Sequence, residues 1–189
     1  LVGSEMCIRD SSWMEPGVSG ATWLAMPPGN EQLRYCGLGP GPAYCDMRHF
    51  CKKGIYDASV TEEFTPYIFP QETGNHYGTE WAAVFDAEGR GLLFKGIQEF
   101  EFSALHYTAE DLDAAQLAKD LRPRKETIVR IDYKQSGIGS NSCGPELLPQ
   151  YRFDEPQFCY SFTIKPIFTE NTDLLRESRT LPGITEESS

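Results

Sequence analysis

Three histidines are the side chains in this sequence best suited to acid and base chemistry: His49, His76 and His106. His106 continues the apolar face formed by Phe100 and Phe102, which is the pattern of a core histidine whose ring is bonded internally. His76 lies in a polar segment, where we expect exposure to solvent. The alternative for His76 is a hydrogen bond to a sugar.

The six cysteines do not form a recognisable metal or disulfide pattern. They stand at positions 7, 36, 45, 51, 143 and 159, with no Cys-x-x-Cys pair. Cys45, His49 and Cys51 could supply half of a zinc site, but a structural zinc site needs four ligands and no second pair has suitable spacing. We therefore expect reduced thiols of the kind found in cytoplasmic proteins, and no metal site.

Motifs that mark common catalytic sites are missing from the sequence. It contains no phosphate-binding loop, no dinucleotide fingerprint, no His-Glu-x-x-His and no Gly-x-Ser-x-Gly. The string GLGPGP at residues 37–42 is unsuited to phosphate, because its prolines lack backbone donors. Acidic residues such as Glu72, Asp86 and Asp132 show no pairing for acid/base work. We assign no catalytic residue.

Alternation of apolar and polar residues predicts several half-buried strands. Segments 98–107, 126–133 and 158–165 each place apolar side chains on one face and polar ones on the other. Residues 81–86 and 91–95 predict a hairpin whose loop contains Gly89, a residue that readily adopts a positive φ. The elements that must hold any site are therefore strands.

One helix is expected after Thr108, which can cap it and form a capping box with Asp111 three residues on. Breaks rich in proline and glycine separate the strands. These features predict an all-β fold, an antiparallel β-sandwich with one short helix. Residues 1–11 resemble an adapter-derived segment and are set aside. Residues 17–167 form the predicted domain, and residues 168–189 are expected to be a polar, disordered tail.

The composition excludes some partners. The 189 residues suit one domain, and 17 basic against 28 acidic residues give a net charge of −11, which opposes nucleic-acid binding. No apolar run approaches the length of a membrane span, which takes about 18 residues or more. We expect a cytoplasmic protein with no membrane or nucleic-acid partner.

Five ordered segments resemble the bacterial large-subunit β-galactosidases, which are glycoside hydrolases. They are LRYCGLGPGPAYCD at 33–46, GIYDASVTEEF at 54–64, PQETGN at 70–75, FSALHYTAEDLDAA at 102–115 and IDYKQSGIGSNSCGP at 131–145. The resemblance implies the C-terminal small-chain domain, a supersandwich related to galactose mutarotase, truncated at its N-terminus.

The resemblance also implies where the chemistry lies. Members of the family hydrolyse terminal β-galactosides such as lactose with two carboxylates on a barrel, which needs about 200 residues or more of alternating strands and helices. The catalytic carboxylates, and the magnesium and sodium of the parent enzyme, are therefore expected outside this chain. The expected partners are the galactoside, the missing barrel and N-terminal domains, and further copies of the parent enzyme.

The resemblance further implies that the loop at residues 137–149 reaches the sugar site. Its candidate contacts are Ser140, Asn141 and Cys143, with Cys143 at the place of a tryptophan found in some members. A structural turn without ligand contact is an alternative. Two other functions stay open: a stand-alone carbohydrate-binding sandwich, and a mutarotase-like epimerase that uses His106 with a nearby glutamate.

Overall fold

The computed structural model describes residues 2–6, 21–139, 146–155 and 158–179. The described strands are β1 (Val2–Met6), β2 (Ala21–Met26), β3 (Gln32–Gly39), β4 (Lys52–Ser59), β5 (His76–Phe85), β6 (Arg90–Leu105), β7 (Thr127–Asp132) and β8 (Tyr160–Phe168). The α-helices are α1 (Ala109–Ala114) and α2 (Leu174–Arg179), and two 3₁₀ turns cover Ala118–Asp120 and Pro149–Tyr151.

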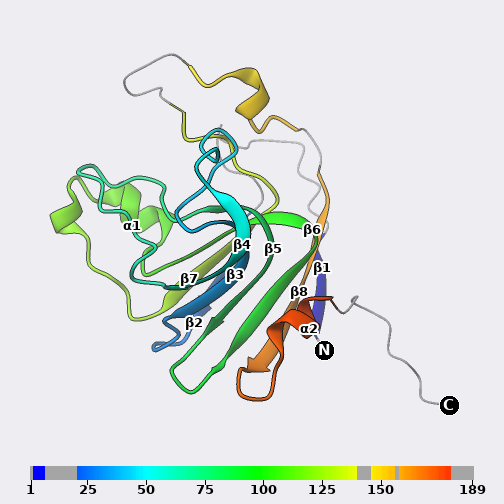
Figure 1. The fold of residues 1–189 in the computed structure, drawn as a ribbon. Helices are drawn as coiled ribbons and strands as arrows, with labels where there is room; N and C mark the ends of the chain where they lie inside the picture. The colour runs from blue at the N-terminus through cyan, green and yellow to red at the C-terminus, as the bar shows by residue number, and fades with distance from the viewer. Residues whose placement is uncertain (1, 7–20, 140–145, 156–157, 180–189) are drawn as a thin grey trace.

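All strand pairs in the described residues are antiparallel, and they join into one eight-stranded sheet in the order β1-β8-β6-β5-β3-β4, with β7 between β2 and β6. The 16-residue β6 joins the sheet's parts, because its first half pairs with β8 and its second half with β7. The sheet is strongly curved (Figure 1). The predicted all-β, antiparallel sandwich-like fold is confirmed.

The predicted hairpin is the turn between β5 and β6. Val84 pairs with Leu92 and Phe85 with Gly91, and Gly89 has a φ of 77°. Asp86 closes the turn, since its backbone N–H donates to the carbonyl of Arg90 and its carboxylate accepts from Arg90 Nε at 2.9 Å. The glycine is required because other residues rarely adopt this positive φ.

The main apolar core lies on one face of the curved sheet. Phe94, Phe100 and Phe102 of β6 pack there with Val129 and Ile131 of β7, all at most 2% exposed. These residues follow the period of two predicted for segments 98–107 and 126–133. The curvature lets both ends of β6 contribute to one core.

A second apolar cluster occupies the opposite face and is covered by α2. Trp81, Leu93 and Ile167 face Leu174, which is 6% exposed at the start of that helix. The expectation of a disordered tail from residue 168 is therefore wrong for α2, since a polar segment with one buried leucine can dock on a sheet. Residues 180–189 lie outside the described part.

The prediction that segments 98–107 and 126–133 are half-buried is also wrong in part. Glu101 and Ser103 are 3% and 4% exposed, and the side chain of Arg130 is 11% exposed. These residues sit on the face of the sheet opposite the main core, where Asn75 and Glu72 from the loop before β5 bond to Glu101 and Arg130 respectively. The loops that cover this face bury or partly bury a group of polar side chains, called the polar interior below: Glu72, Asn75, Glu101, Arg130 and Asp132.

The segment set aside at the N-terminus takes part in the sheet, because β1 pairs with β8 along its whole length. The helix predicted after Thr108 is present as α1. Thr108 Oγ1 accepts from the N–H of Asp111, whose carboxylate accepts from the N–H of Thr108, so the predicted capping box is confirmed. Among the described helices, none is long and apolar enough to cross a membrane.

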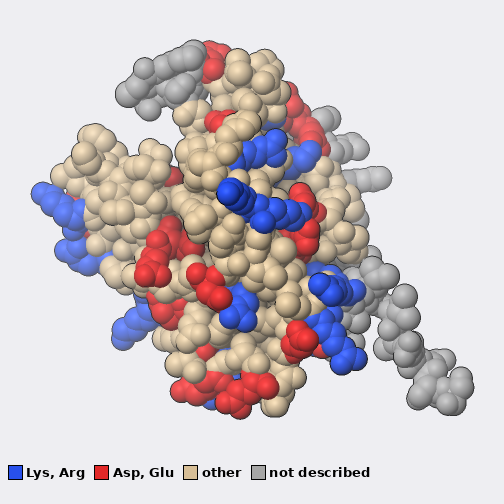
Figure 2. Space-filling view, in the orientation of Figure 1, with Lys and Arg blue, Asp and Glu red and all other residues tan. Residues whose placement is uncertain are grey.

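Charged side chains of both signs are mixed over the face of the molecule shown in Figure 2. Several form exposed ion pairs, such as Arg34 with Asp57 and Arg124 with Asp111. Exposed pairs of this kind contribute about 0 to 1 kcal/mol each. They therefore say little about stability or function.

Candidate functional site

The candidate sugar-contact loop, residues 137–149, leaves the end of β7. Its first three residues and residues 146–149 are described. The predicted contacts Ser140, Asn141 and Cys143 lie outside the described residues. The described residues include the base from which the loop departs.

Gln135 fixes this base through three hydrogen bonds to the polar interior. Its backbone N–H donates to Glu101 Oε1 at 2.9 Å. Its side-chain Nε2 donates to Asn75 Oδ1 at 3.1 Å and to Asp132 Oδ2 at 2.6 Å. A residue held by both backbone and side chain has one orientation, so the chain enters the loop in a defined direction.

Asn75 connects the same group to the other loops. Its Nδ2 donates to Glu101 Oε2 at 2.6 Å and to the carbonyl of Ala43 at 3.0 Å. The backbone carbonyl of Asn75 accepts a hydrogen bond from the N–H of Ala43 at 2.7 Å. The side chain has no exposed surface, so these partners replace water. Four of the segments that carry the resemblance therefore meet at Asn75 or directly beside it. They are residues 33–46, 70–75, 102–115 and 131–145.

Arg130 supplies the positive charge of the polar interior. Its two terminal nitrogens donate to the carboxylate of Glu72 at 2.6 and 2.7 Å, and its Nε lies 2.8 Å from Asp132 Oδ2. The guanidinium also lies over the ring of Trp23, at 5.6 Å from its centroid. A bidentate pair of this geometry fixes both side chains.

The buried carboxylates have perturbed acidity. Burial raises the pKa of Glu101 to about 7, against the opposing effect of its hydrogen bonds from Gln135 and Asn75. Burial likewise raises the pKa of Asp132 to about 6, although the charge of Arg130 lowers it. Both groups are buried and hydrogen-bonded inside the protein, so they help to hold the loop base.

Aromatic side chains hold the chain where it returns from the loop. The rings of Tyr133 and Phe158 are stacked, with centroids 5.1 Å apart and planes at 3°, and Phe153 packs edge-on against both. The carbonyl of Tyr151 accepts from the N–H of Gly137 at 2.8 Å. The two ends of the loop are thus tied to each other.

The expected exposure of His76 is wrong. The residue begins β5 and is fully buried, with its ring 4.0 Å from the ring of Tyr35 and its Nε2 2.9 Å from Glu63 Oε2. The polar neighbours that indicated a surface loop instead face the polar interior. In this conformation, a sugar in solvent does not reach His76.

His106 is bonded internally, as expected, but it pairs with a carboxylate and lies beyond the apolar core. Its Nε2 lies 2.7 Å from Glu31 Oε2 and its Nδ1 3.0 Å from the carbonyl of Glu126. The side chain keeps 15% of its surface exposed. Burial raises the pKa of Glu31, but hydrogen bonds from Thr61 and His106 outweigh it, and the net result is a lowered pKa.

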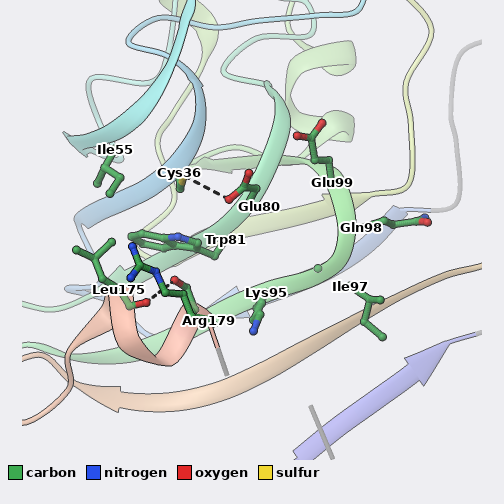
Figure 3. A pocket seen from close by; sticks show the side chains of 12 residues that line it. Cys36, Ile55, Glu80, Trp81, Lys95, Ile97, Gln98, Glu99, Leu175 and Arg179 are labelled. Atoms are coloured by element: carbon green, nitrogen blue, oxygen red, sulfur yellow. Dashed lines mark hydrogen bonds between the residues drawn. The ribbon is translucent and has the colours of Figure 1, made fainter. Parts of the chain in front are cut away.

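A pocket of about 430 Å³ lies between β4, β5, β6 and α2 (Figure 3). Trp81 lines it together with Glu80 and Lys95, and the Cys36 thiol points to Glu80 at 3.8 Å. His76, the one sequence-predicted contact within the described residues, does not line this pocket. A smaller hollow of about 350 Å³ lies beside Tyr133 and Lys134, near the loop base.

Within the described residues, no group of three or more His, Cys, Asp or Glu side chains is arranged to hold a metal ion. Cys45 instead contacts backbone groups of the protein. Its thiol lies 3.7 Å from the carbonyls of Gln135 and Tyr151, at the two ends of the loop.

Sequence reasoning from periodicity missed the residues that hold the loop base, above all Asn75, Glu101 and Gln135. A strand pattern places Glu101 on a solvent face and says nothing about Gln135. The available signal was the position of all three within or directly beside the segments that carry the resemblance. Polar residues in such segments were candidates for one shared network.

Comparison with known proteins agrees with these segments. Residues 19–164 match the family described as beta galactosidase small chain. The chain is 37% identical over 142 residues to a beta-galactosidase of Actinobacillus pleuropneumoniae and 35% identical over 142 residues to one of Staphylococcus xylosus, in each case over 75% of this chain. It is 32% identical over 150 residues, 79% of this chain, to a beta-galactosidase of Kluyveromyces lactis.

The matched part covers 13% of the first of these relatives and 14% of the other two. This chain thus corresponds to about one seventh or less of their length. The family match spans the sheet from β2 into β8 and includes the whole loop base described above. The chain belongs to the β-galactosidase small-chain family.

Proposed function

We propose that this chain is the part of a β-galactosidase that forms one wall of the sugar site, through the loop at residues 137–149. The observation that carries the proposal is the loop base, where Gln135, Asn75 and Glu101 from three separate segments bond to one another. A loop built only to connect two strands does not need a fixed base of this kind. The relatives named above are beta-galactosidases, which supports a β-galactoside such as lactose as the ligand.

The catalytic carboxylates of the proposed enzyme lie outside this chain. Glycosidases use two carboxyl groups on either side of a sugar, about 5 to 10 Å apart. Glu101 and Asp132 adjoin each other, but both are buried, and the two Glu101 oxygens and Asp132 Oδ2 are bonded to Asn75 and Gln135 in the interior. We expect no hydrolysis of nitrophenyl β-galactoside by the purified chain, and hydrolysis that survives removal of host enzymes would contradict this assignment.

The remaining parts of the parent enzyme follow from the same proposal. Its magnesium and sodium ions and its barrel belong to regions outside this chain, this chain supplies contacts between copies of the enzyme, and the whole enzyme works in the cytoplasm. The chain's contribution is to bind and orient the sugar. Ser140 and Asn141 can donate and accept hydrogen bonds to hydroxyl groups, and Cys143 offers a small apolar contact.

The test replaces Cys143 with tryptophan in the full-length parent enzyme. An indole adds a large apolar surface beside the sugar, so we expect Cys143→Trp to change the KM for lactose or the choice of acceptor sugar more than it changes the melting temperature. Cys159→Trp, at an exposed cysteine outside the loop, is the matched control. Altered stability with unchanged kinetics would remove Cys143 from the sugar site.

A second function keeps one specific observation in its favour. A mutarotase-like epimerase needs a histidine and a carboxylate, and His106 and Glu31 lie 2.7 Å apart at a partly exposed position. Both ring nitrogens of His106 already face acceptors, so a sugar would have to displace Glu31. Polarimetry of fresh α-D-galactose separates the cases: acceleration by the chain that His106→Asn abolishes would favour the epimerase.

The third candidate, a stand-alone carbohydrate-binding sandwich, makes a different prediction for the same material. It requires the chain alone to bind galactose or lactose in isothermal titration. The wall proposal expects no measurable heat, because one wall leaves most of a sugar in water. Saturable binding by the isolated chain would favour the module.

A further inference from the structure

The carboxylate of Asp46 holds the first residues of the loop at 137–149 from a distant part of the sequence. Its Oδ1 accepts a hydrogen bond from the N–H of Ile138 at 3.2 Å, and its Oδ2 accepts one from the N–H of Gly139 at 2.8 Å. One anionic group thus binds two consecutive backbone donors. Such charge-assisted bonds are stronger than bonds between neutral groups.

The approach between Asp46 and the loop is too close for any side chain at position 137. A Cβ on Gly137 would lie 2.3 Å from Asp46 Cγ and 2.5 Å from its Oδ2. Contacts below about 3 Å force atoms to move. Gly139 adds a φ of 57°, which turns the chain directly after the second hydrogen bond. The Gly-Ile-Gly sequence therefore fits the carboxylate.

Asp46 is itself held in place. It lies in a tight turn in which Tyr44 and Met47 exchange two backbone hydrogen bonds of 3.0 Å. The Cys45 thiol, next to it, contacts the carbonyls of Gln135 and Tyr151. The turn is anchored further by Ala43, which shares two hydrogen bonds with the buried Asn75. The acceptor is thus fixed to the same interior as the loop base.

We propose that Asp46 is a positioning residue for substrate binding, which fixes the direction of the loop where it leaves its base. The inference rests on the proposed function of the loop. Within the described part of the loop, Asp46 accepts hydrogen bonds from the backbone of Ile138 and Gly139, so we expect its effect on a sugar to be indirect. Without it, Gln135 still fixes the start of the loop, but the N–H groups of Ile138 and Gly139 lose their partner, so the backbone of these two residues is no longer held in one direction.

The experiment uses the full-length parent enzyme and two variants that break the contact from opposite sides. Asp46→Ala removes the acceptor, whereas Gly137→Ala keeps the carboxylate and pushes the backbone away from it. We expect each to raise the KM for lactose about 10-fold and to change kcat less than about 2-fold, because substrate orientation depends on the loop and the chemistry does not. Asp46→Asn, which keeps one acceptor oxygen, should recover part of the loss.

Two controls match these changes. Asp57→Ala removes an exposed carboxylate that pairs with Arg34 on the sheet, and Gly41→Ala places a Cβ no closer than 3.9 Å to a neighbour. Both should keep the parent KM. If Asp46→Ala and Gly137→Ala lower only the melting temperature, the contact is structural and the inference is wrong.

The test of Cys143 separates this inference from the proposed function. If Cys143→Trp changes the KM while Asp46→Ala and Gly137→Ala do not, the loop binds sugar but Asp46 does not position it. If none of the three changes the KM, the proposed function fails. If all three do, we expect the double variant of Asp46→Ala and Cys143→Trp to differ from the product of the single effects, since both act through one loop.

Discussion

Replacement of Glu101 by glutamine tests the buried polar interior under the loop. The carboxyl group is 3% exposed, and burial raises its pKa from an ordinary value of 4.5 to about 7. The folded protein therefore holds a proton on Glu101 at pH values where the unfolded chain has released it. Its contribution to stability is full below about pH 4.5 and is lost as the pH rises through about 7.

The size of this effect follows from the difference between the two pKa values. About 7 minus 4.5 is about 2.5 pH units, and each unit corresponds to about 1.36 kcal/mol, which gives about 3 kcal/mol. Asp132 acts in the same direction at lower pH, because burial raises its pKa from 3.8 to about 6. Glu101→Gln removes the pH-dependent stability contributed by Glu101 and keeps that contributed by Asp132.

The assay is urea unfolding followed by tryptophan fluorescence at several pH values between 4.5 and 8. From the lower to the higher pH, the free energy of unfolding of the parent chain should fall by about 3 kcal/mol more than that of Glu101→Gln. Groups common to both proteins cancel in this difference. Glu88→Gln, at a carboxylate that is 67% exposed, is the control and should keep the parent profile.

The absolute stability of Glu101→Gln is not the test, because an amide must turn its NH₂ toward either Asn75 or Gln135, both of which donate to Glu101. That mismatch costs about 1 to 3 kcal/mol at every pH. Only the change of the free energy of unfolding with pH shows whether Glu101 carries a proton in the folded protein. Equal slopes for the parent and the variant would show that Glu101 is ionised in the folded protein, and the argument from burial would fail.

Three further predictions concern stability and use the same unfolding assay. Leu174→Ala should cost about 2 to 4 kcal/mol because this side chain of α2 is buried against the sheet, whereas Leu175→Ala, at 44% exposure, should cost less than about 1 kcal/mol. Arg130→Met should cost about 3 kcal/mol or more because Glu72 loses its buried partner, and Arg34→Met, in an exposed pair, less than about 1 kcal/mol. Gly89→Ala should cost more than about 1 kcal/mol, since its φ is 77° and an added Cβ would meet Thr169 Oγ1 at 2.0 Å. Equal losses within either pair, or an unchanged Gly89→Ala, would contradict these reasons.

Local patterns predict the parts of this fold whose environment is set by neighbours in sequence. The capping box at Thr108 and the hairpin turn at Gly89 depend on a few consecutive residues, and both are as expected. The apolar face of β6 follows from alternation, because Phe100 and Phe102 must turn toward the same side. These predictions needed no knowledge of the tertiary contacts.

The opposite face of β6 could not be predicted in this way. Alternation places Glu101 in solvent, and only the loop that brings Asn75 over the sheet makes that position an interior. The same loop buries His76, which has polar neighbours in sequence that normally indicate exposure. Helix α2 is a similar case, since one leucine is enough to dock it on a sheet face.

The polar interior also explains why a loop base is built from bonded side chains and not from apolar packing. Apolar contacts stabilise without regard to direction, and a core of similar volume can be as stable as buried charges. The bonds among Gln135, Asn75 and Glu101 are directional, so a shifted loop would leave buried donors and acceptors unpaired, at a cost of about 1 to 3 kcal/mol each. That penalty selects one orientation of the chain at Gln135. Asp46 extends the same principle to the next residues, where the chain has left the sheet and no strand partner can direct it.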